Sequence, residues 1–399
     1  MKVLQVNCVY RKGSTGKIVH DIHTELQKRG IESVVCYGRG EKVKEKNVYK
    51  TCGELYSKFN NFLSRFTGLM YGGCFFSTGK LIRIIKKEKP DIVHLHCING
   101  YFVNIYRLVT WLKKSGISTV LTLHAEFMHT ANCGHAFDCD KWKTGCGFCP
   151  RLRQETKSLL FDRTHTSWRK MKHAFDEFQN LTIIAVSNWI AQRAAQSPIF
   201  AGHTIQTIHT GIYIKNFDSQ RDFLLERSLR AQYGIPEGKK IVLHVTPSFR
   251  NPVKGGIFVS MLSEMLPEGN ICVVVGGGAE TTKRLIAVPF VSDQKQLSAF
   301  YKMADVLVVT SKCDNYPTVC LEANCCGTPV VGFDVGGVKE TIFEGMGETV
   351  PYGDMEALLA NVVNWSAKKT EIPKEIIADC LEKQSRERMT GEYISQYYS

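Results

Sequence analysis

Short runs of consecutive apolar residues, rich in valine and isoleucine, recur along this chain and alternate with longer segments of helical spacing. Unbroken apolar runs of this length are typical of parallel strands that helices cover on both faces. The pattern predicts strands at 3–9, 33–37, 92–96, 119–124, 182–187, 205–210, 241–246, 271–275, 287–291, 306–310 and 329–333.

Two successive sets of such strands predict an α/β protein with two doubly wound, Rossmann-like domains. The length of 399 residues agrees with two domains, because single hydrophobic cores rarely grow beyond about 250–300 residues. We place the first domain at 1–205 and the second at 206–375, with the break near 200–215.

No secretory leader is apparent, because the residues KVLQVNCVY that follow Met1 include no long apolar stretch and no cleavage signal. A run of about 18 apolar residues is also absent, so the sequence predicts no membrane-spanning helix. We therefore expect a cytoplasmic protein whose 15 cysteines remain reduced.

Charge is distributed unevenly between the two halves of the chain. Residues 1–200 hold 31 Lys and Arg against 15 Asp and Glu, a net charge of +16. Residues 201–399 hold 20 against 23, a net charge of −3, so the whole chain carries +13. A basic half suggests an anionic partner such as nucleic acid, an anionic lipid surface or a phosphorylated substrate.

One predicted helix in the basic half, at 56–70, has an aromatic face beside basic residues. An aromatic face next to cations is the pattern of a helix that lies on an anionic membrane, and the alternative is that the aromatic face packs on its own domain. The side chains concerned are Tyr56, Phe59, Phe62, Leu63, Phe66, Leu69 and Met70, with Lys58 and Arg65 among them and Lys80, Arg83, Lys86, Lys87 and Lys89 following.

The stretch GSTGKI follows the first predicted strand and begins a helix. A Walker A motif is excluded, because Arg11 stands where its first glycine is required and Ile18 where its Ser or Thr is required. Free N–H groups at a helix N-terminus still favour an anion there, and the alternative is an ordinary strand-to-helix turn. The candidate anion-binding residues are Ser14, Thr15, Gly16 and Lys17.

The segment 306–342 contains two acidic residues eight positions apart, Asp314 in a loop and Glu322 in a helix that begins near Thr318. A carboxylate fixed on a helix can accept hydrogen bonds from both hydroxyls of a ribose, while a solvated helix carboxylate is the alternative. The strand that follows ends in Gly336 and Gly337, which allow close backbone approach to a ligand.

This segment resembles the E-x7-E region of retaining GT-B glycosyltransferases of glycosyltransferase family 4. The resemblance implies that Glu322 binds the ribose of a nucleotide-diphosphate sugar and that Asp314, one methylene shorter than the usual Glu, contacts the donor sugar. The motif is similar to that of a subgroup acting in colanic acid and O-antigen assembly, and it adds Asn315, Tyr316, Pro317 and Thr318 to the expected donor site.

The resemblance extends over nearly the whole chain. It implies that Lys254 and Arg250 bind the diphosphate and that Gly277 belongs to the family's glycine turn. It also implies that residues 14–17 face the donor phosphates or the acceptor. The alternative for Lys254 and Arg250 is that both are solvated surface cations. His124 would lie near the reacting sugar, unless it is a hydrogen-bonded core histidine. The resemblance also implies that a helix at 376–399 crosses back to the first domain.

Four cysteines lie close together in the sequence, in the pattern C-x5-C-x6-C-x2-C. In a reducing compartment this pattern indicates a structural zinc site, with four reduced thiols as the alternative and His135 as a possible substitute ligand. The predicted ligands are Cys133, Cys139, Cys146 and Cys149, in a loop at 133–149.

The resemblance implies a retaining transfer of sugar from a UDP- or GDP-sugar, and together with the basic, aromatic first domain it predicts a lipid-linked saccharide acceptor in bacterial surface polysaccharide synthesis. The enzyme would work on the anionic inner face of the cytoplasmic membrane, without a catalytic metal and without nucleic acid. The alternatives are a zinc-containing nucleic-acid-binding protein, a Rossmann dehydrogenase, which the missing G-x-G-x-x-G disfavours, and a GT-B sugar-nucleotide epimerase.

Overall fold

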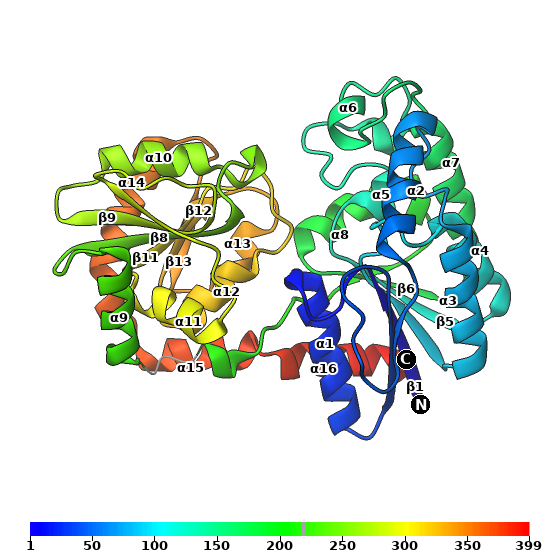
Figure 1. Cartoon of the computed structure of the whole chain (residues 1–399), viewed down its shortest axis with the longest axis horizontal. Helices are drawn as coiled ribbons and strands as arrows, with labels where there is room; N and C mark the ends of the chain where they lie inside the picture. The colour runs from blue at the N-terminus through cyan, green and yellow to red at the C-terminus, as the bar shows by residue number, and fades with distance from the viewer. Residues whose placement is uncertain (218–220, 399) are drawn as a thin grey trace. The chain divides into compact units, whose positions relative to one another are not determined.

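A computed structural model describes residues 1–217 and 221–398 of the chain. The chain divides into two compact units, of which unit 1 comprises residues 1–209 and 390–399 and unit 2 comprises residues 210–389 (Figure 1). The expected boundary at 205/206 lies shortly before the observed one.

Unit 1 contains a seven-stranded sheet in the order β3-β2-β1-β4-β5-β6-β7, and every pairing within its described part is parallel. The strands are β1 (Lys2–Asn7), β2 (Glu32–Tyr37), β3 (Val48–Lys50), β4 (Ile92–Leu95), β5 (Ser118–Leu123), β6 (Leu181–Ala185) and β7 (Ile205–Thr207).

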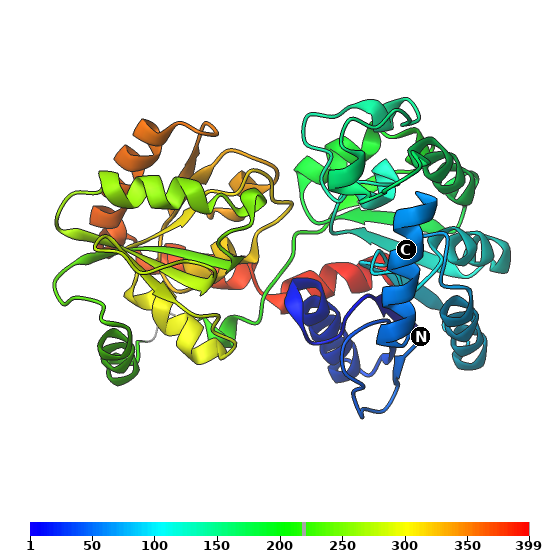
Figure 2. The same ribbon diagram turned by 45° about the horizontal axis from the view of Figure 1, so that its top comes forward.

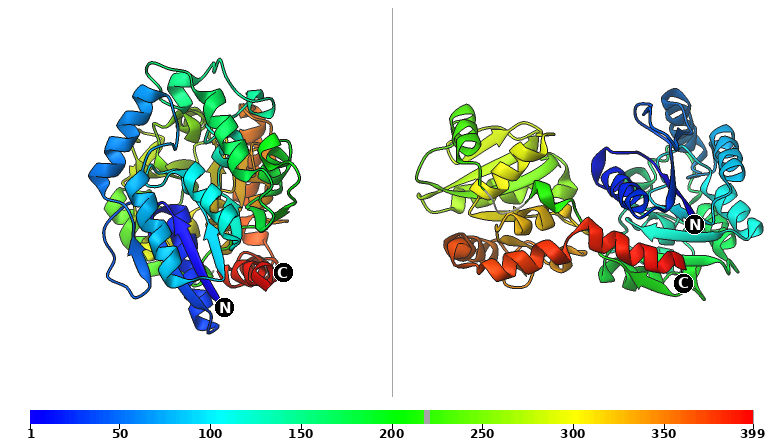
Figure 3. Two further views of the ribbon diagram at one scale, coloured as in Figure 1. Left: turned by 90° about the vertical axis from the view of Figure 1, so that its right-hand side faces the viewer. Right: turned by 90° about the horizontal axis from the view of Figure 1, so that it is seen from below.

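The helices of unit 1 connect these strands and cover the sheet on both sides, as Figure 3 shows. They are α1 (Gly13–Lys28), α2 (Glu54–Thr67), α3 (Phe75–Glu88), α4 (Ile105–Ser115), α5 (Phe127–Thr130), α6 (Leu152–Glu155), α7 (Thr164–Phe175) and α8 (Asn188–Ala195), with short 3-10 turns at Lys141–Lys143 and Pro198–Phe200. The last described helix, α16 (Arg386–Tyr398), ends in this unit, where the Tyr397 hydroxyl lies 2.7 Å from Nδ1 of His94.

Unit 2 contains a six-stranded sheet in the order β10-β9-β8-β11-β12-β13, again parallel throughout its described part. The strands are β8 (Lys240–Ser248), β9 (Asn270–Gly277), β10 (Leu285–Val288), β11 (Val306–Val309), β12 (Val330–Phe333) and β13 (Gly347–Val350). The helices are α9 (Phe223–Tyr233), α10 (Gly256–Met265), α11 (Gln294–Met303), α12 (Thr318–Cys325), α13 (Val338–Thr341), α14 (Met355–Lys368) and α15 (Lys374–Lys383), with 3-10 turns at Ile214–Asn216, Pro252–Lys254 and Lys369–Glu371.

Alternate residues of the unit 2 strands enter two separate hydrophobic cores. Leu243, Val273 and Leu307 pack with residues of α9, α11 and α12, whereas Val242 and Val274 pack with residues of α10 and α14. The two sets of helices lie on opposite sides of the sheet (Figure 1, Figure 2). Apolar residues at every position are therefore required, which explains the unbroken apolar runs in the sequence.

Each strand expected from the sequence is present within a few residues of its predicted position. Two strands were not expected, β3 and β13, which are short and form sheet edges. The expected helix at 376–399 is replaced by two helices, α15 and α16, and only residues 390–399 group with unit 1. The structure holds no described helix of the length and apolarity that a membrane crossing requires.

Helix α2 presents its polar face to its own unit. The buried side chains are Ser57, Asn60 and Ser64, while Phe59 and Phe62 are each 56% exposed. The Asn60 carboxamide fixes this orientation, because it accepts a hydrogen bond from the buried backbone N–H of Cys74 at 2.7 Å. The structure thus excludes the alternative in which this aromatic face packs on its own domain. The observed helix ends at Thr67, so Leu69 and Met70 lie outside it although the prediction included them, and Met70 is buried.

Candidate active site

The candidate donor residues of unit 2 follow the carboxyl ends of neighbouring parallel strands. Lys254 follows β8, Asp314 follows β11, and Gly336 and Gly337 follow β12. Strands β8 and β11 are adjacent, and the chain runs outward in opposite directions from them, to β9 and β10 on one side and to β12 and β13 on the other. Ligands of open α/β sheets bind at such a switch point, outside the carboxyl ends of the strands.

Lys254 and Asp314 form an ion pair across this switch point. The Lys254 Nζ lies 2.6 Å from Oδ2 of Asp314, and the two side chains are 30% and 18% exposed. Both loops are held together by their backbones, since the Lys312 N–H donates to the Val253 carbonyl at 2.8 Å. The pair is therefore positioned before any ligand arrives, and its partial exposure leaves it accessible to an anion.

Gly255 makes this arrangement possible. Its φ is +69°, and a Cβ at this position would lie 1.8 Å from the carbonyl oxygen of Thr310. The Thr310 hydroxyl in turn donates to the Gly255 carbonyl at 3.0 Å. Helix α10 begins immediately afterwards at Gly256, so Lys254 precedes a helix N-terminus, where backbone dipoles favour a phosphate.

Gly336 and Gly337 pack against the backbone of Asp314. A Cβ on Gly336 would lie 2.0 Å from the Asp314 carbonyl oxygen, and the Gly337 N–H donates to that oxygen at 2.9 Å. From the sequence, these glycines are expected to permit close backbone approach to a ligand. In the structure their close contact is with the loop that carries Asp314.

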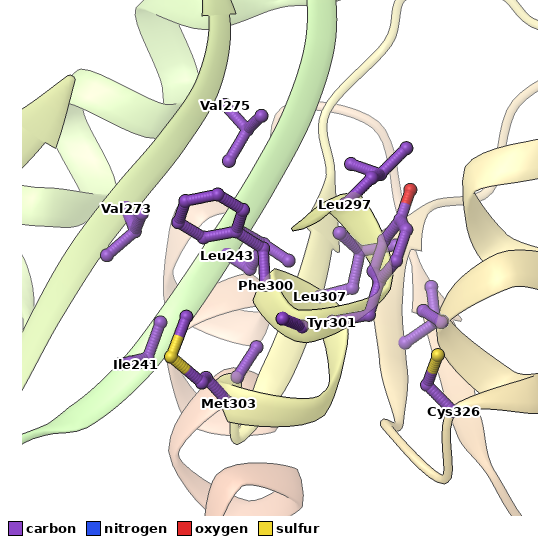
Figure 4. Close-up of a cluster of buried hydrophobic side chains, with 14 of the residues drawn as sticks. Ile241, Leu243, Val273, Val275, Leu297, Phe300, Tyr301, Met303, Leu307 and Cys326 are labelled. Carbon is purple, nitrogen blue, oxygen red and sulfur yellow. The ribbon is translucent and has the colours of Figure 1, made fainter. Parts of the chain in front are cut away.

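Glu322 lies in α12 with 8% of its surface exposed, and a tyrosine from α11 holds it in place. The Tyr301 hydroxyl donates to Oε2 of Glu322 at 2.7 Å. Burial, and next the Glu322 carboxylate, raise the pKa of Tyr301 well above its ordinary value, so the hydroxyl keeps its proton and remains a donor. The Tyr301 ring lies in the core with Leu297 and Leu307 (Figure 4). Glu322 is thus a buried, oriented carboxylate, which excludes the solvated alternative.

The remaining residues of the motif form the start of α12. Pro317 caps the helix, Thr318 is its first residue, and Asn315 is buried with 7% exposure. Tyr316 packs at the edge of the hydrophobic core. These residues fix the turn between Asp314 and Glu322.

Arg250 and Gly277 lie near one another at the ends of β8 and β9. The Arg250 Nε donates to the Gly278 carbonyl at 3.1 Å, and its guanidinium is 2.6 Å from Glu280. The Gly277 carbonyl accepts from the Phe249 N–H at 2.8 Å. Arg250 is 72% exposed and pairs with Glu280, whereas Lys254 pairs with Asp314. The two cations expected at the diphosphate thus have different acidic partners.

In unit 1, the residues of the GSTGK stretch lie in the first turns of α1, which begins at Gly13. The chain turns sharply at the start of this helix, where Arg11 and Gly13 have φ values of +62° and +66°. Gly16 is buried, and a Cβ there would lie 3.2 Å from Val9. Ser14, Thr15 and Lys17 therefore belong to a helix N-terminus that follows a parallel strand, and not to a loose loop.

His124 follows β5 and lies beside His96, which follows β4. His124 Nε2 and His96 Nδ1 are 3.1 Å apart. Burial lowers the pKa of His124 to about 4 and that of His96 well below its ordinary value, so both imidazoles are neutral at neutral pH. A neutral imidazole at a strand end can exchange hydrogen bonds with a sugar hydroxyl without adding charge.

The four cysteines of the loop 133–149 lie near one another, because the other three sulfurs each act on the pKa of Cys133. Burial raises the pKa of Cys146 to about 12 and also raises that of Cys149, so these groups are neutral thiols. Within the described part of the chain, no three of the four sulfurs lie within 4.8 Å of one another, whereas sulfurs on one zinc ion are separated by about 3.8 Å. A zinc ion would require this loop to close around it.

Two residues that position the candidate site were not predicted from the sequence, Tyr301 and Thr310. Tyr301 orients Glu322, and Thr310 holds the turn that carries Lys254. Neither belongs to a motif, and each acts through a contact between distant segments that spacing alone does not reveal.

Two protein families match this chain. The family described as Glycosyltransferase Family 4 matches residues 15–216, and the family described as Glycosyl transferases group 1 matches residues 226–379. Unit 1 and unit 2 thus correspond to the two family matches.

Relatives and solved structures agree with these matches. A protein of Escherichia coli K12, provisionally named a colanic acid biosynthesis glycosyl transferase, WcaC, is 24% identical over 421 aligned positions, which cover 100% of this chain and 98% of the relative. The N-acetyl-alpha-D-glucosaminyl L-malate synthase of Bacillus anthracis is 26% identical over 338 positions, which cover 80% and 77% of the two chains.

Among solved structures, Anabaena Alr3699/HepE in complex with UDP-glucose is similar with a TM-score of 0.65 at 16% identity, covering 99% of this chain and all of that one. A glycosyltransferase of Rickettsia africae gives a TM-score of 0.67 at 15% identity, covering 99% and 97%. The expected fold class, two parallel-sheet Rossmann-like domains of the GT-B type, is confirmed.

Proposed function

This chain belongs to Glycosyltransferase Family 4, and from that premise we propose that it transfers a sugar from a nucleotide-diphosphate sugar, UDP- or GDP-linked, to a lipid-linked saccharide acceptor with retention of anomeric configuration. The observation that carries the proposal is the Lys254–Asp314 pair at the switch point of the unit 2 sheet, with the oriented carboxylate of Glu322 on the helix that follows.

In the proposed reaction, the bond between the anomeric carbon and the β-phosphate oxygen breaks while the acceptor hydroxyl attacks on the same face of the sugar. A β-phosphate oxygen takes the hydroxyl proton. Negative charge grows on the departing diphosphate, and Lys254, with the N-terminus of α10, would stabilise it. Glu322 would bind the ribose, Asp314 the donor sugar, and neutral His124 a sugar hydroxyl.

The test is transfer from a panel of radiolabelled UDP- and GDP-sugars to a bacterial lipid extract, with the product linkage determined by NMR. We expect one donor to label the lipid fraction and the donor anomer to be retained in the product. Consumption of donor without any acceptor would instead indicate an epimerase, and an inverted product would contradict the retaining course.

The aromatic face of α2 supports a location at a membrane surface. Its exposed side chains continue into the exposed loop 159–161, because the Leu159 N–H donates to the Arg65 carbonyl at 2.8 Å. We call this surface the apolar patch, and it consists of Leu55, Phe59, Phe62, Leu63, Phe66, Phe75, Phe76, Leu159, Leu160 and Phe161, each at least 38% exposed. Exposed apolar patches of this kind mark partner or membrane surfaces.

Replacing Phe59, Phe62 and Phe66 together with serine should weaken binding to anionic vesicles more than about a hundredfold, because each buried aromatic ring contributes about 1.5–3 kcal/mol. The melting temperature should change little, since these side chains are exposed. The control is the double change Phe223→Ser and Leu224→Ser, which removes exposed apolar residues from α9 of unit 2. Equal vesicle binding by both variants would contradict the membrane role of α2.

We propose that the cysteine loop holds a structural zinc ion. Its backbone includes three non-glycine residues with positive φ, Phe137, Cys146 and Phe148. Trp142 anchors the middle of the loop in the core with 2% exposure, whereas Phe148, beside Cys149, is 95% exposed. Four thiolates on one ion would fix the cysteine-bearing ends of the loop.

Zinc measured by mass spectrometry in the purified protein should be stoichiometric, and the double change Cys146→Ser and Cys149→Ser should abolish it. Cys8→Ser, a partly exposed cysteine outside the loop, should leave the zinc content unchanged. Metal-free wild-type protein with an unchanged melting temperature would contradict the proposal.

A further inference from the structure

A basic groove crosses unit 1 between α3, α4 and α7, on surface that the proposed reaction does not use. Its volume is about 670 Å³, within the range of small-ligand sites. Five basic side chains line it and no carboxylate does. They are Lys86 from α3, Arg107 and Lys114 from α4, and Lys170 and His173 from α7.

Helical spacing directs these side chains into one groove. Arg107 and Lys114 are seven residues apart on α4, and Lys170 and His173 are three apart on α7, so each pair shares one helical face. None of the five forms an ion pair within 4.0 Å inside the described ranges 1–217 and 221–398.

Aromatic rings line the groove beneath the cations. The Lys86 Nζ lies 6.0 Å from the centre of the Trp111 ring, and the Lys170 Nζ lies 5.9 Å from the centre of the Tyr106 ring. Arg107 donates to the Phe75 carbonyl at 3.2 Å. The groove thus combines apolar walls with fixed cations, which suits an amphiphilic anion better than a free hydrophilic ion.

The groove opens at the apolar patch. Phe75, which is 58% exposed, belongs to the patch and also lines the groove. The adjacent Phe76 contacts α2, because its N–H donates to the Tyr56 hydroxyl at 3.3 Å and the two rings are 6.1 Å apart. A molecule with an anionic head in the groove would therefore have its apolar portion beside the patch.

We propose that this groove binds the phosphate-bearing headgroup of an anionic phospholipid while the apolar patch contacts the acyl region. The inference rests on the proposed membrane location and adds to it a discrete headgroup site. Charge complementarity selects this occupant, because four Lys and Arg side chains without a carboxylate match a phosphodiester, and the patch matches the hydrocarbon attached to it.

The experiment compares the charge reversals Lys114→Glu and Lys170→Glu, made together, with the matched pair Lys42→Glu and Lys46→Glu. Both pairs change exposed lysines of unit 1 and alter the net charge equally, but the second pair lies on the loop before β3, away from the groove. Vesicles of phosphatidylcholine with phosphatidylglycerol serve as the probe. Each cation near an anionic leaflet contributes about fivefold to partitioning, so the groove pair should weaken binding at least roughly thirtyfold, and the control pair only severalfold.

A second readout uses Trp111, whose fluorescence should change when dispersed short-chain phosphatidylglycerol is added, but not with inorganic phosphate or short-chain phosphatidylcholine. Trp111→Phe should remove that change. Equal vesicle binding by the two charge variants, or an equal response to inorganic phosphate, would overturn the headgroup site. Nucleotide binding, measured in parallel, separates this outcome from failure of the proposed function, since the groove variants should bind nucleotide as the wild type does.

Discussion

Replacing Lys254 with methionine is expected to lower the rate constant for sugar transfer by about 10²–10³-fold, the loss typical of removing one preorganised group that stabilises charge in a transition state. Methionine keeps the unbranched shape of the side chain but removes the charge opposite Asp314. Steady-state transfer kinetics at saturating donor would measure the effect, and the melting temperature would show that the fold is retained.

Two matched variants make this result specific. Lys295→Met removes an exposed lysine from α11 and should leave transfer unchanged. Arg250→Met should cost less than Lys254→Met, because Arg250 is 72% exposed and its guanidinium pairs with Glu280. If Lys254→Met kept more than about a tenth of the wild-type rate, far above the loss expected for a charge-stabilising group, its assignment to the departing diphosphate would be wrong.

Replacing Glu322 with glutamine is expected to raise the dissociation constant for the nucleoside diphosphate about 10- to 100-fold, since a hydrogen bond to a charged group contributes about 1.5–3 kcal/mol. Glutamine keeps a carbonyl oxygen that can accept from the Tyr301 hydroxyl, so the buried contact at 2.7 Å survives and stability should hold. Titration calorimetry on the two proteins would measure the difference.

Tyr301→Phe provides the complementary test, because it leaves the Glu322 carboxylate intact and removes only the group that orients it. Affinity should fall by less than in Glu322→Gln, and the loss should depend on the ribose, so that inorganic diphosphate binds both proteins equally. Unchanged nucleotide affinity in Glu322→Gln would exclude Glu322 from the ribose site.

The sequence was sufficient to predict most strands of the two sheets, because a strand that is covered on both faces is apolar at nearly every position. The strands β3, VYK, and β13, GETV, could not be predicted in this way. Each pairs on one side only, at a sheet edge, and needs no continuous apolar run.

The orientation of α2 could not be predicted from its periodicity. The sequence shows that the helix has an aromatic face and a polar face, but not which of them is buried. That choice depends on contacts with distant segments, such as the Asn60 acceptor for the Cys74 N–H and the Ser57 hydroxyl, which donates to the Gly100 carbonyl at 3.1 Å. The motif residues Asp314 and Glu322 were recognised from their spacing. The structure was required to find Tyr301, which orients Glu322, and Thr310, which holds the turn that carries Lys254.

The most direct test of the proposed donor site is a thermal shift with UDP, GDP, ADP, ATP and NAD on the wild type and on Glu322→Gln. A ligand that binds only the folded state stabilises it by about 2.7 kcal/mol at a hundredfold excess over its dissociation constant. We predict a rise in melting temperature with UDP or GDP alone, reduced in the variant, which would also identify the base of the donor. No shift with either diphosphate, or an equal shift in both proteins, would contradict a nucleotide-sugar site at Lys254, Asp314 and Glu322.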